Sequence, residues 1–548
     1  MVMLSLLRSS RSLGRPASRM LPRSTLEGVR SLQTAAEAAE NVSYTRGLFL
    51  GVNNAKRAFP YPQLSENEKE TLQMLVEPVA KYFTTVDSRA IDETKKIPQQ
   101  VMSDLKELGL FGLQIPEELE GLGLSNTGYA RVCEEITDAS LAVTVMAHQS
   151  IGLKGILLNG NDEQKAKYLP KLATGEHIAA FALTEPSSGS DAGSIKTRAR
   201  GFGGITNGPP EDKLGIRGSN TVQVFFDNTK VPIENVLGGG PDNKTGGAAG
   251  VGQGFKVAMD TLNNGHFGLG ACAGSSLRRV IGMGAEHANQ RKQFGSSLSS
   301  FGLIKKKFDV VTLDAYAIEL MGFMATDTIA RGYPSCEIEA AMCKVYGSEV
   351  AFSGINECIQ PFERCMRDCR IISIFEGLNE ILRMIIALSG IRVMGGTGFM
   401  KDWPFERYMR DCRILSIFEG TNEILRMLIA LSGIRTAGDR LFAVDKVLAD
   451  PLKDPSREGD LEPSPAQFQL ERIADSTIAL FAMTSTISRA SSPLSRNIES
   501  ATHEQKLTEL YCDTVSDKVK MLLDELKKDD RRRSARARGV HLEPRDRR

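Results

Sequence analysis

A 32-residue segment of this 548-residue chain occurs twice, at 361–392 and at 404–435, with 28 identical positions. Each copy carries one glutamate in the same apolar context, Glu376 in SIFEGLNE and Glu419 in SIFEGTNE. Desolvation raises the pKa of a carboxyl group beside isoleucine and phenylalanine, which is what a general base working near neutral pH requires. A lone glutamate before a helix more often interacts only with the helix dipole, so the surrounding sequence must decide between the two roles.

The residues after the second glutamate predict a well-capped helix. Thr421 stands where its hydroxyl can cap the segment TNEILRMLIALSG, which we expect Gly433 to end. The first copy has Leu378 instead, which cannot cap, a loss of roughly 1 kcal/mol. Four apolar residues are expected to face inward: Ile424, Leu425, Leu428 and Leu431.

A glycine pair also distinguishes the two copies. Gly395 and Gly396 precede Glu419 and form a turn where the backbone can approach a ligand closely, whereas no such turn precedes Glu376. We therefore predict that Glu419 is the catalytic residue. Residues 361–392 are interpreted as an insertion between Gln360 and Val393.

Apolar periodicity predicts helices, then strands, then helices. From about 65 to 175, apolar residues recur at three- and four-residue steps, and the same pattern returns from about 254 to 435. Between them, the alternation in TVQVFF predicts short strands. After a polar, proline-containing linker, one further helix is expected to bury Leu507, Tyr511, Val515, Val519 and Leu522 on one face.

Bulk properties limit the classes of protein to consider. The length predicts two to four domains, and 41% hydrophobic with 25% charged residues is typical of a soluble globular protein. A net charge of +1 gives no reason to expect nucleic-acid binding. The sequence contains no run of 18 or more apolar residues, so we expect no membrane span. The nine cysteines contain no CxxC pair and are expected to be buried or half-buried free thiols, and the six dispersed histidines predict no metal site.

Both ends of the chain are rich in arginine. The first 26 residues hold five arginines, many serines and no acid, the composition of a mitochondrial transit peptide. The last 18 hold eight arginines and are expected to form a disordered tail that is either solvated or in contact with an anionic membrane.

Four motifs in order resemble the acyl-CoA dehydrogenase family: FALTEPSSGSD (181–191), RKQFG (291–295), VMGGTGF around Gly395 and IFEGTNEI (417–424). The resemblance covers roughly 45–436. Finer matches, such as AHQSIGLKGILL and EDKLGIRGSNT, resemble the very-long-chain branch of the family and its paralogue in complex I assembly.

The resemblance implies a mostly α fold with a small β middle domain. The expected parts are a transit peptide (1–36), an N-terminal helical domain (37–180), a truncated β-barrel domain (181–245), a C-terminal four-helix bundle (246–436) that includes the duplicated 361–392, a helical extension (437–525) and a basic tail (526–548).

The family's chemistry explains why a buried glutamate is needed. The α-hydrogen of an acyl thioester is a weaker acid than any carboxyl group, so its removal requires a desolvated base and donors to the thioester oxygen. The β-hydrogen leaves as hydride, which no side chain accepts, so FAD is implied. The resemblance assigns the base to Glu419, whose own N–H binds the thioester oxygen together with a flavin ribityl hydroxyl. The implied reaction converts long or very-long-chain fatty acyl-CoA to trans-2-enoyl-CoA in mitochondrial β-oxidation.

The resemblance also implies the binding residues and partners. FAD is expected to contact Phe181, Leu183, Thr184, Ser190, Arg291, Gln293, Gln360, Gly395, Gly396, Thr421 and Glu423, with Arg291 reaching its pyrophosphate across a homodimer interface. The acyl-CoA substrate is expected to contact Ser190, His266, Gly420 and Arg426, although Arg426 on a solvated helix face is an equal alternative. Electron-transfer flavoprotein is the implied electron acceptor. The expected location is the mitochondrial matrix or the matrix face of the inner membrane, and the implied contacts include that membrane and complex I assembly factors.

Three departures from the family pattern support a second hypothesis. Strands with a Trp-Ile-Ser/Thr motif that shields the flavin are missing between Arg200 and Gly201, and the single tryptophan, Trp403, lies in another motif. The 361–392 insertion separates Gln360 from the glycine turn, and His266 replaces a family arginine. The alternative is therefore a catalytically impaired isoform or an assembly scaffold without turnover, and flavin retention separates the two.

Overall fold

The computed structural model describes residues 43–50, 55–189, 194–195, 204–227, 229, 231–239, 244–293, 295–331, 337–359, 404–437, 465–496 and 500–537. Several predictions concern residues outside this part of the chain. They are the transit peptide, Ser190, Gln360, the Gly395–Gly396 turn, the first copy of the repeat and Trp403.

The N-terminal region is helical, as predicted. Its helices are α3 (Tyr44–Phe49), α4 (Ala55–Ala58), α5 (Glu66–Phe83), α6 (Ser88–Thr94), α7 (Gln99–Glu107), α8 (Asn126–Cys133), α9 (Ala139–Met146), α10 (Leu153–Asn159) and α11 (Asp162–Ala173). Short polar side chains accept the first free amides of α5, α6, α8, α9 and α11, which explains where these helices begin: Ser65, Asp87, Ser125, Asp138 and Asn161.

A π-helical turn, η2 (Ala147–Gly152), joins α9 to α10 into one helical stretch. This stretch, Ala139–Asn159, is by length and composition alone sufficient to cross a membrane. Leu141, Val145 and Leu153 are fully buried within the protein, so the stretch is a core helix of this fold.

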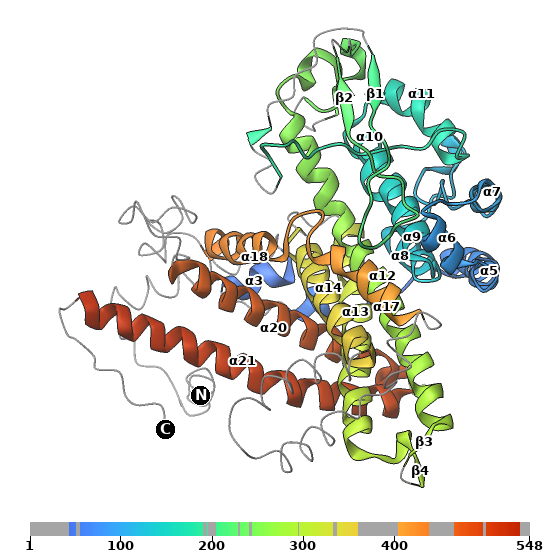
Figure 1. Ribbon diagram of the computed structural model, residues 1–548. Helices are drawn as coiled ribbons and strands as arrows, with labels where there is room; N and C mark the ends of the chain where they lie inside the picture. Colours follow the sequence, from blue (N-terminus) through green and yellow to red (C-terminus); the bar gives the residue numbers. More distant parts are fainter. Residues whose placement is uncertain are drawn as a thin grey trace, which may run out of the picture.

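Four long helices form the C-terminal bundle: α12 (Gly254–Gln290), α13 (Gly302–Ala330), α14 (Glu337–Ile359) and α18 (Asn422–Ala437), with the shorter α17 (Phe405–Arg413) beside them (Figure 1). Glycines permit the close approach of α12 and α14. A Cβ on Gly270 would lie 3.1 Å from the Cys343 carbonyl oxygen, and one on Gly347 would lie 3.1 Å from Gly270 Cα.

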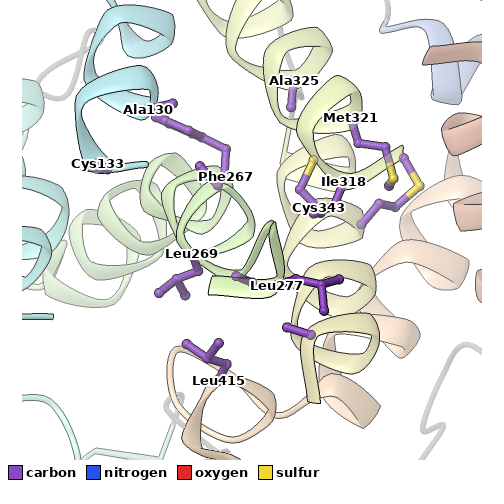
Figure 2. Close-up of a cluster of buried hydrophobic side chains, with 14 of the residues drawn as sticks. Ala130, Cys133, Phe267, Leu269, Leu277, Ile318, Met321, Ala325, Cys343 and Leu415 are labelled. Atoms are coloured by element: carbon purple, nitrogen blue, oxygen red, sulfur yellow. The ribbon is translucent and has the colours of Figure 1, made fainter. Parts of the chain in front are cut away.

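One large apolar core joins the N-terminal helices to this bundle. Figure 2 shows Ala130 and Cys133 of α8 together with Phe267 and Leu269 of α12 and side chains of α13 and α14. Leu415, from the turn just before Glu419, belongs to the same cluster. The five cysteines whose side chains are described are free thiols and are buried or half-buried, as expected.

Two helices follow the bundle, α20 (Pro465–Arg496) and α21 (Ala501–Ala537), and α20 packs against α13 and α18 (Figure 1). The predicted apolar face of α21 is confirmed, because Tyr511, Val519 and Leu522 are buried. The prediction of disorder from 531 onward is wrong for residues 531–537, which continue α21.

The middle region contains little sheet. Strands β1 (Ile205–Asn207) and β2 (Val224–Phe226) form a two-stranded antiparallel ladder, and β3 (Lys292–Gln293) with β4 (Ser296–Ser297) forms a small hairpin elsewhere. The expected alternation of TVQVFF is not realised, since Phe225 and Phe226 are 53% and 52% exposed. Within the described residues no second layer covers them, and the truncation of the barrel stays a prediction.

Candidate active site

The backbone around Glu419 has an unusual conformation. After the short 3₁₀ turn η8 (Ile414–Ser416), Glu419 and Gly420 both have positive φ, 53° and 94°, before α18 begins at Asn422. A left-handed glutamate is energetically unfavourable, and such conformations persist only where the surrounding structure holds them. Backbone strain of this kind clusters at functional sites.

The Glu419 carboxyl group is suited to accept a proton. The residue as a whole is half-buried, but its Oε2 atom is shielded from solvent and has no hydrogen-bond partner among the described residues. Burial raises the pKa of Glu419 to about 7, and the nearby Lys344 cation opposes this shift. Ile417 does not provide the expected desolvation, because it is 48% exposed, whereas Phe418 packs against the core.

His266, on α12, holds the carbonyl of Glu419. Its Nε2 lies 2.9 Å from the Glu419 carbonyl oxygen and donates to it, which leaves Nδ1 as the acceptor nitrogen of a neutral ring. Burial lowers the pKa of His266 to about 4, so the ring is neutral at physiological pH. Nδ1 is buried and has no partner among the described residues.

Lys344, on α14, holds the next carbonyl. Its Nζ donates to the Gly420 carbonyl oxygen at 2.6 Å and to Asn422 Oδ1 at 3.0 Å. Burial lowers the pKa of Lys344 to about 8, so the ammonium form predominates at neutral pH. Sequence reasoning missed this residue, although a lysine within the apolar run AAMCKVYG is a recognisable signal of a buried, paired cation.

The predicted helix cap at Thr421 is confirmed. Its hydroxyl accepts from the Ile424 amide at 3.4 Å, at the third position of α18. Gly433 does not end the helix, because α18 continues to Ala437. Gly433 is buried against the ring of Phe49, and a Cβ there would lie 2.2 Å from Phe49 Cζ.

The guanidinium group of Arg426 is paired with protein carboxylates. Its Nη1 and Nη2 donate to the two carboxylate oxygens of Glu349 at 2.6 and 2.8 Å, and its Nε donates to Asp475 Oδ1 at 2.7 Å. The solvated alternative is wrong for this helix face, and contact between Arg426 and acyl-CoA stays a prediction. Glu423, in the same helix, is exposed.

The structure thus brings Glu419, Gly420, Thr421 and His266 together, while other predicted residues lie apart from them. Arg291 and His266 are 25 positions apart on α12 and its C-cap, roughly 37 Å at the rise of an α-helix. Arg291 is exposed, beside β3, and Figure 1 places β3 at the far end of α12 from β1 and β2.

The FALTEPSS segment remains accessible. Thr184 is exposed, and Phe181 and Leu183 are half-buried in an extended stretch that ends in a Glu185–Ser188 bridge. A ligand can therefore reach the side chain of Thr184 without a conformational change in this segment.

Comparison with known proteins identifies the family. Models described as the N-terminal and C-terminal domains of acyl-CoA dehydrogenases match residues 66–176 and 252–391, and the second matches again at 389–433, where the repeat lies. The very long-chain specific acyl-CoA dehydrogenase of Homo sapiens mitochondria is 37% identical over 86% of this chain and 82% of its own length. This chain belongs to the acyl-CoA dehydrogenase family.

Further relatives agree with the family assignment. A Bacillus subtilis acyl-CoA dehydrogenase is 31% identical over 60% of this chain and 99% of its own length. The structure of a Bacillus anthracis acyl-CoA dehydrogenase complexed with FAD superposes with a TM-score of 0.69 at 25% identity, covering 91% of this chain and 96% of that one. A model described as ACAD9/ACADV, C-terminal domain, matches 464–538, the region of α20 and α21.

The residues present fit the family's FAD and acyl-CoA at the start of α18. Glu419 Oε2 and His266 Nδ1 are buried polar atoms without a protein partner in the described part of the chain. Buried polar atoms are ordinarily hydrogen-bonded, so this pair marks a place for polar groups of a ligand. Against this fit, the described residues of the middle region contribute a single two-stranded ladder, β1 with β2.

Proposed function

We propose that this acyl-CoA dehydrogenase family enzyme catalyses the FAD-dependent α,β-dehydrogenation of long or very-long-chain fatty acyl-CoA to trans-2-enoyl-CoA. The observation that carries the proposal is the carboxyl group of Glu419, whose Oε2 atom is shielded from solvent and has no partner among the described residues, and whose pKa is raised to about 7 by burial. A base with this pKa is deprotonated in part at neutral pH and still strong enough to accept a carbon-bound proton. The similarity to the human very-long-chain enzyme supports the substrate class.

In the proposed reaction, Glu419 removes the proton from the α-carbon of the thioester. The left-handed turn fixes the direction of its side chain, because His266 and Lys344 hold the carbonyls of residues 419 and 420. The Glu419 amide binds the thioester oxygen, where negative charge develops. When bound, FAD supplies the chemistry of hydride acceptance at the β-carbon.

The residues proposed to hold FAD come from several segments of the chain. Phe181, Leu183, Thr184 and Ser190 belong to the first, and Thr421 and Glu423 to the start of α18. Gln360, Gly395 and Gly396 are assigned to FAD binding by their motif. Arg291 and Gln293 lie at the distant end of α12, so a partner subunit would supply them to each site, in line with a homodimer.

Cellular context extends the proposal. The basic, acid-free first 26 residues and the mitochondrial relatives favour import into the mitochondrial matrix. Electron-transfer flavoprotein is the proposed electron acceptor, and the C-terminal extension is the proposed contact with the inner membrane.

A purified chain tests this function directly. We expect flavin absorbance in the protein as isolated or after incubation with FAD, and bleaching of that absorbance when palmitoyl-CoA is added without oxygen. Bleaching by butyryl-CoA but not by palmitoyl-CoA would contradict the substrate class, and a flavin spectrum that no acyl-CoA changes would contradict the reaction.

One observation favours the alternative of an impaired isoform or assembly scaffold. Ile205, Phe225 and Phe226 of the two-stranded ladder are each more than half exposed, so the middle region buries little apolar surface of its own. A chain that fails to take up FAD at any concentration would support this alternative, and a flavin-loaded chain that turns over palmitoyl-CoA would exclude it.

A further inference from the structure

A chain of hydrogen bonds leads away from the catalytic turn. Lys344 links the Gly420 carbonyl to Asn422 Oδ1, and the Asn422 amide nitrogen donates to Ser348 Oγ at 2.9 Å and to Glu349 Oε1 at 3.1 Å. Lys344 and Asn422 are 1% and 3% exposed, so these bonds are screened little by solvent. The chain therefore ties the backbone beside the base to α14.

The chain continues into the C-terminal extension. Glu349 accepts both terminal nitrogens of Arg426, and the remaining donor, Nε, is paired with Asp475 of α20. The side chains of Arg426 and Asp475 are 14% and 22% exposed, and Arg–carboxylate pairs with this geometry are among the stronger polar contacts. α20 also packs directly on α18 and α14.

We propose that Lys344, Asn422, Glu349, Arg426 and Asp475 form a positioning network through which the C-terminal extension holds the catalytic turn in its left-handed conformation. The proposal rests on the proposed function of Glu419 as base. The extension thereby affects the chemical step through its contact with α18. This effect is separate from any interaction that the outer faces of α20 and α21 make with a membrane or a partner. Arg426 is a positioning residue in this arrangement, because all of its nitrogen donors face protein carboxylates.

The physical reason is the strain of the turn. A glutamate at φ 53° stays in place only if surrounding contacts favour that conformation over relaxed alternatives, whereas Gly420, at φ 94°, adopts its conformation without a steric cost. Lys344 supplies one such contact, and Asn422 and Glu349 fix the position of Lys344 and of the first turn of α18. Asp475 in turn removes the freedom of Arg426 to draw Glu349 away from Asn422.

The substitution Asp475→Asn in the full chain tests the network, with Glu525→Gln as a matched control. Glu525 Oε2 accepts from Arg472 Nε at 3.0 Å, one helical turn before Asp475 on α20, so the control breaks an ion pair of the extension that does not reach α18. The first readout is hydrogen–deuterium exchange of residues 414–425 in the protein without ligand. Thr421 replaces Leu378, so the peptides of the two repeat copies differ in mass.

We expect Asp475→Asn to accelerate exchange in 414–425 about three- to tenfold, as weakening of one charge-assisted bond allows, whereas Glu525→Gln leaves it unchanged. The rate of flavin reduction should fall by a similar factor with the KM for palmitoyl-CoA unchanged, and Asp475→Glu should restore both. Equal exchange in the Asp475→Asn variant and the unsubstituted chain would overturn the proposal, as would a change in KM alone, which would mean that Arg426 contacts the substrate. A lack of turnover in every variant would contradict the proposed function, and the exchange result would still decide the network.

Discussion

At the scale of single residues, the environment that makes Glu419 a base near neutral pH also lowers the stability of the folded protein when this carboxyl group is charged. Its Oε2 atom has no hydrogen-bond partner among the described residues, and burial disfavours the charged form in the native state, so the pKa rises from 4.5 to about 7. The folded protein therefore binds this proton more tightly than the unfolded chain does between these values. The contribution of Glu419 to stability is fully present below pH 4.5 and is lost as pH rises through about 7.

The substitution Glu419→Gln removes this dependence. We expect the variant to match the unsubstituted chain in free energy of unfolding near about pH 4 and to exceed it by up to about 3 kcal/mol above about pH 7. Denaturant unfolding at both pH values measures the difference. Glu423→Gln, which changes an exposed carboxyl group in the same helix, is the control. A variant that is equally or less stable than the unsubstituted chain at high pH would contradict the buried environment of Glu419.

The sequence predicts some of this site and misses the rest for a physical reason. Thr421 and Glu419 could be assigned because a helix cap and its neighbouring motif are local in the chain. Lys344 contacts Gly420 from 76 positions away, and Asp475 reaches Arg426 from 49 positions away, so neither contact leaves a local pattern. The family resemblance marks His266 as a departure from the family arginine and as a substrate contact, but its bond to the Glu419 carbonyl required the fold.

At the scale of secondary structure, the distance between α12 and α14 determines where the two donors stand. His266 lies one turn before Gly270 on α12, and Lys344 lies nearly one turn before Gly347 on α14. A side chain at either glycine would meet the facing helix. The glycines therefore place both donors within reach of the same turn.

Two substitutions on α12 separate close packing from helix propensity. Gly270→Ala places a Cβ 3.1 Å from the Cys343 carbonyl oxygen, and we expect it to destabilise the protein by about 1–3 kcal/mol and to slow flavin reduction. Gly282→Ala, on the same helix with nothing within 4 Å, should stabilise by about 0.5–1 kcal/mol. Thermal unfolding of both variants measures these effects, and a stabilised Gly270→Ala would mean that α12 and α14 are not tightly packed there.

Local sequence patterns fail to predict helix ends and strands where tertiary contacts decide the outcome. Glycine ordinarily ends helices, but Gly433 lies inside α18 because the ring of Phe49 occupies the space that a side chain would need. Likewise, the alternation in TVQVFF predicts a half-buried strand, but alternation is realised only where a neighbouring layer covers one face. Phe225 and Phe226 lack that layer in the described part of the chain.

At the scale of the whole molecule, the second copy of the repeat belongs to the described bundle. The described second copy supplies core residues Tyr408, Cys412, Leu415 and Leu425, which are all buried. The bundle therefore uses the second copy, and the first copy separates Gln360 from the glycine turn in the chain.

Deleting each copy tests this division. A chain lacking 361–392 joins Gln360 to Val393, and we expect it to retain at least as much FAD per chain as the full-length protein. A chain lacking 404–435 keeps Glu376 but loses the buried residues of the second copy, and we expect it to lose both FAD and solubility. The absorbance ratio of flavin to protein measures the FAD content of both deletion chains, and the amount of protein in the soluble fraction measures solubility. Loss of FAD in the chain lacking 361–392, with FAD retained in the chain lacking 404–435, would assign the bundle to the first copy.

The repeat also provides the most direct test of the catalytic assignment, since it places two equivalent glutamates in one chain. We expect Glu419→Gln in FAD-loaded protein to slow the anaerobic bleaching of flavin by palmitoyl-CoA by at least about a hundredfold, the usual contribution of a general base. Glu376→Gln should bleach at the rate of the unsubstituted chain. Undiminished bleaching in the Glu419→Gln variant, or an equal loss in the Glu376→Gln variant, would contradict the assignment of Glu419 as the base.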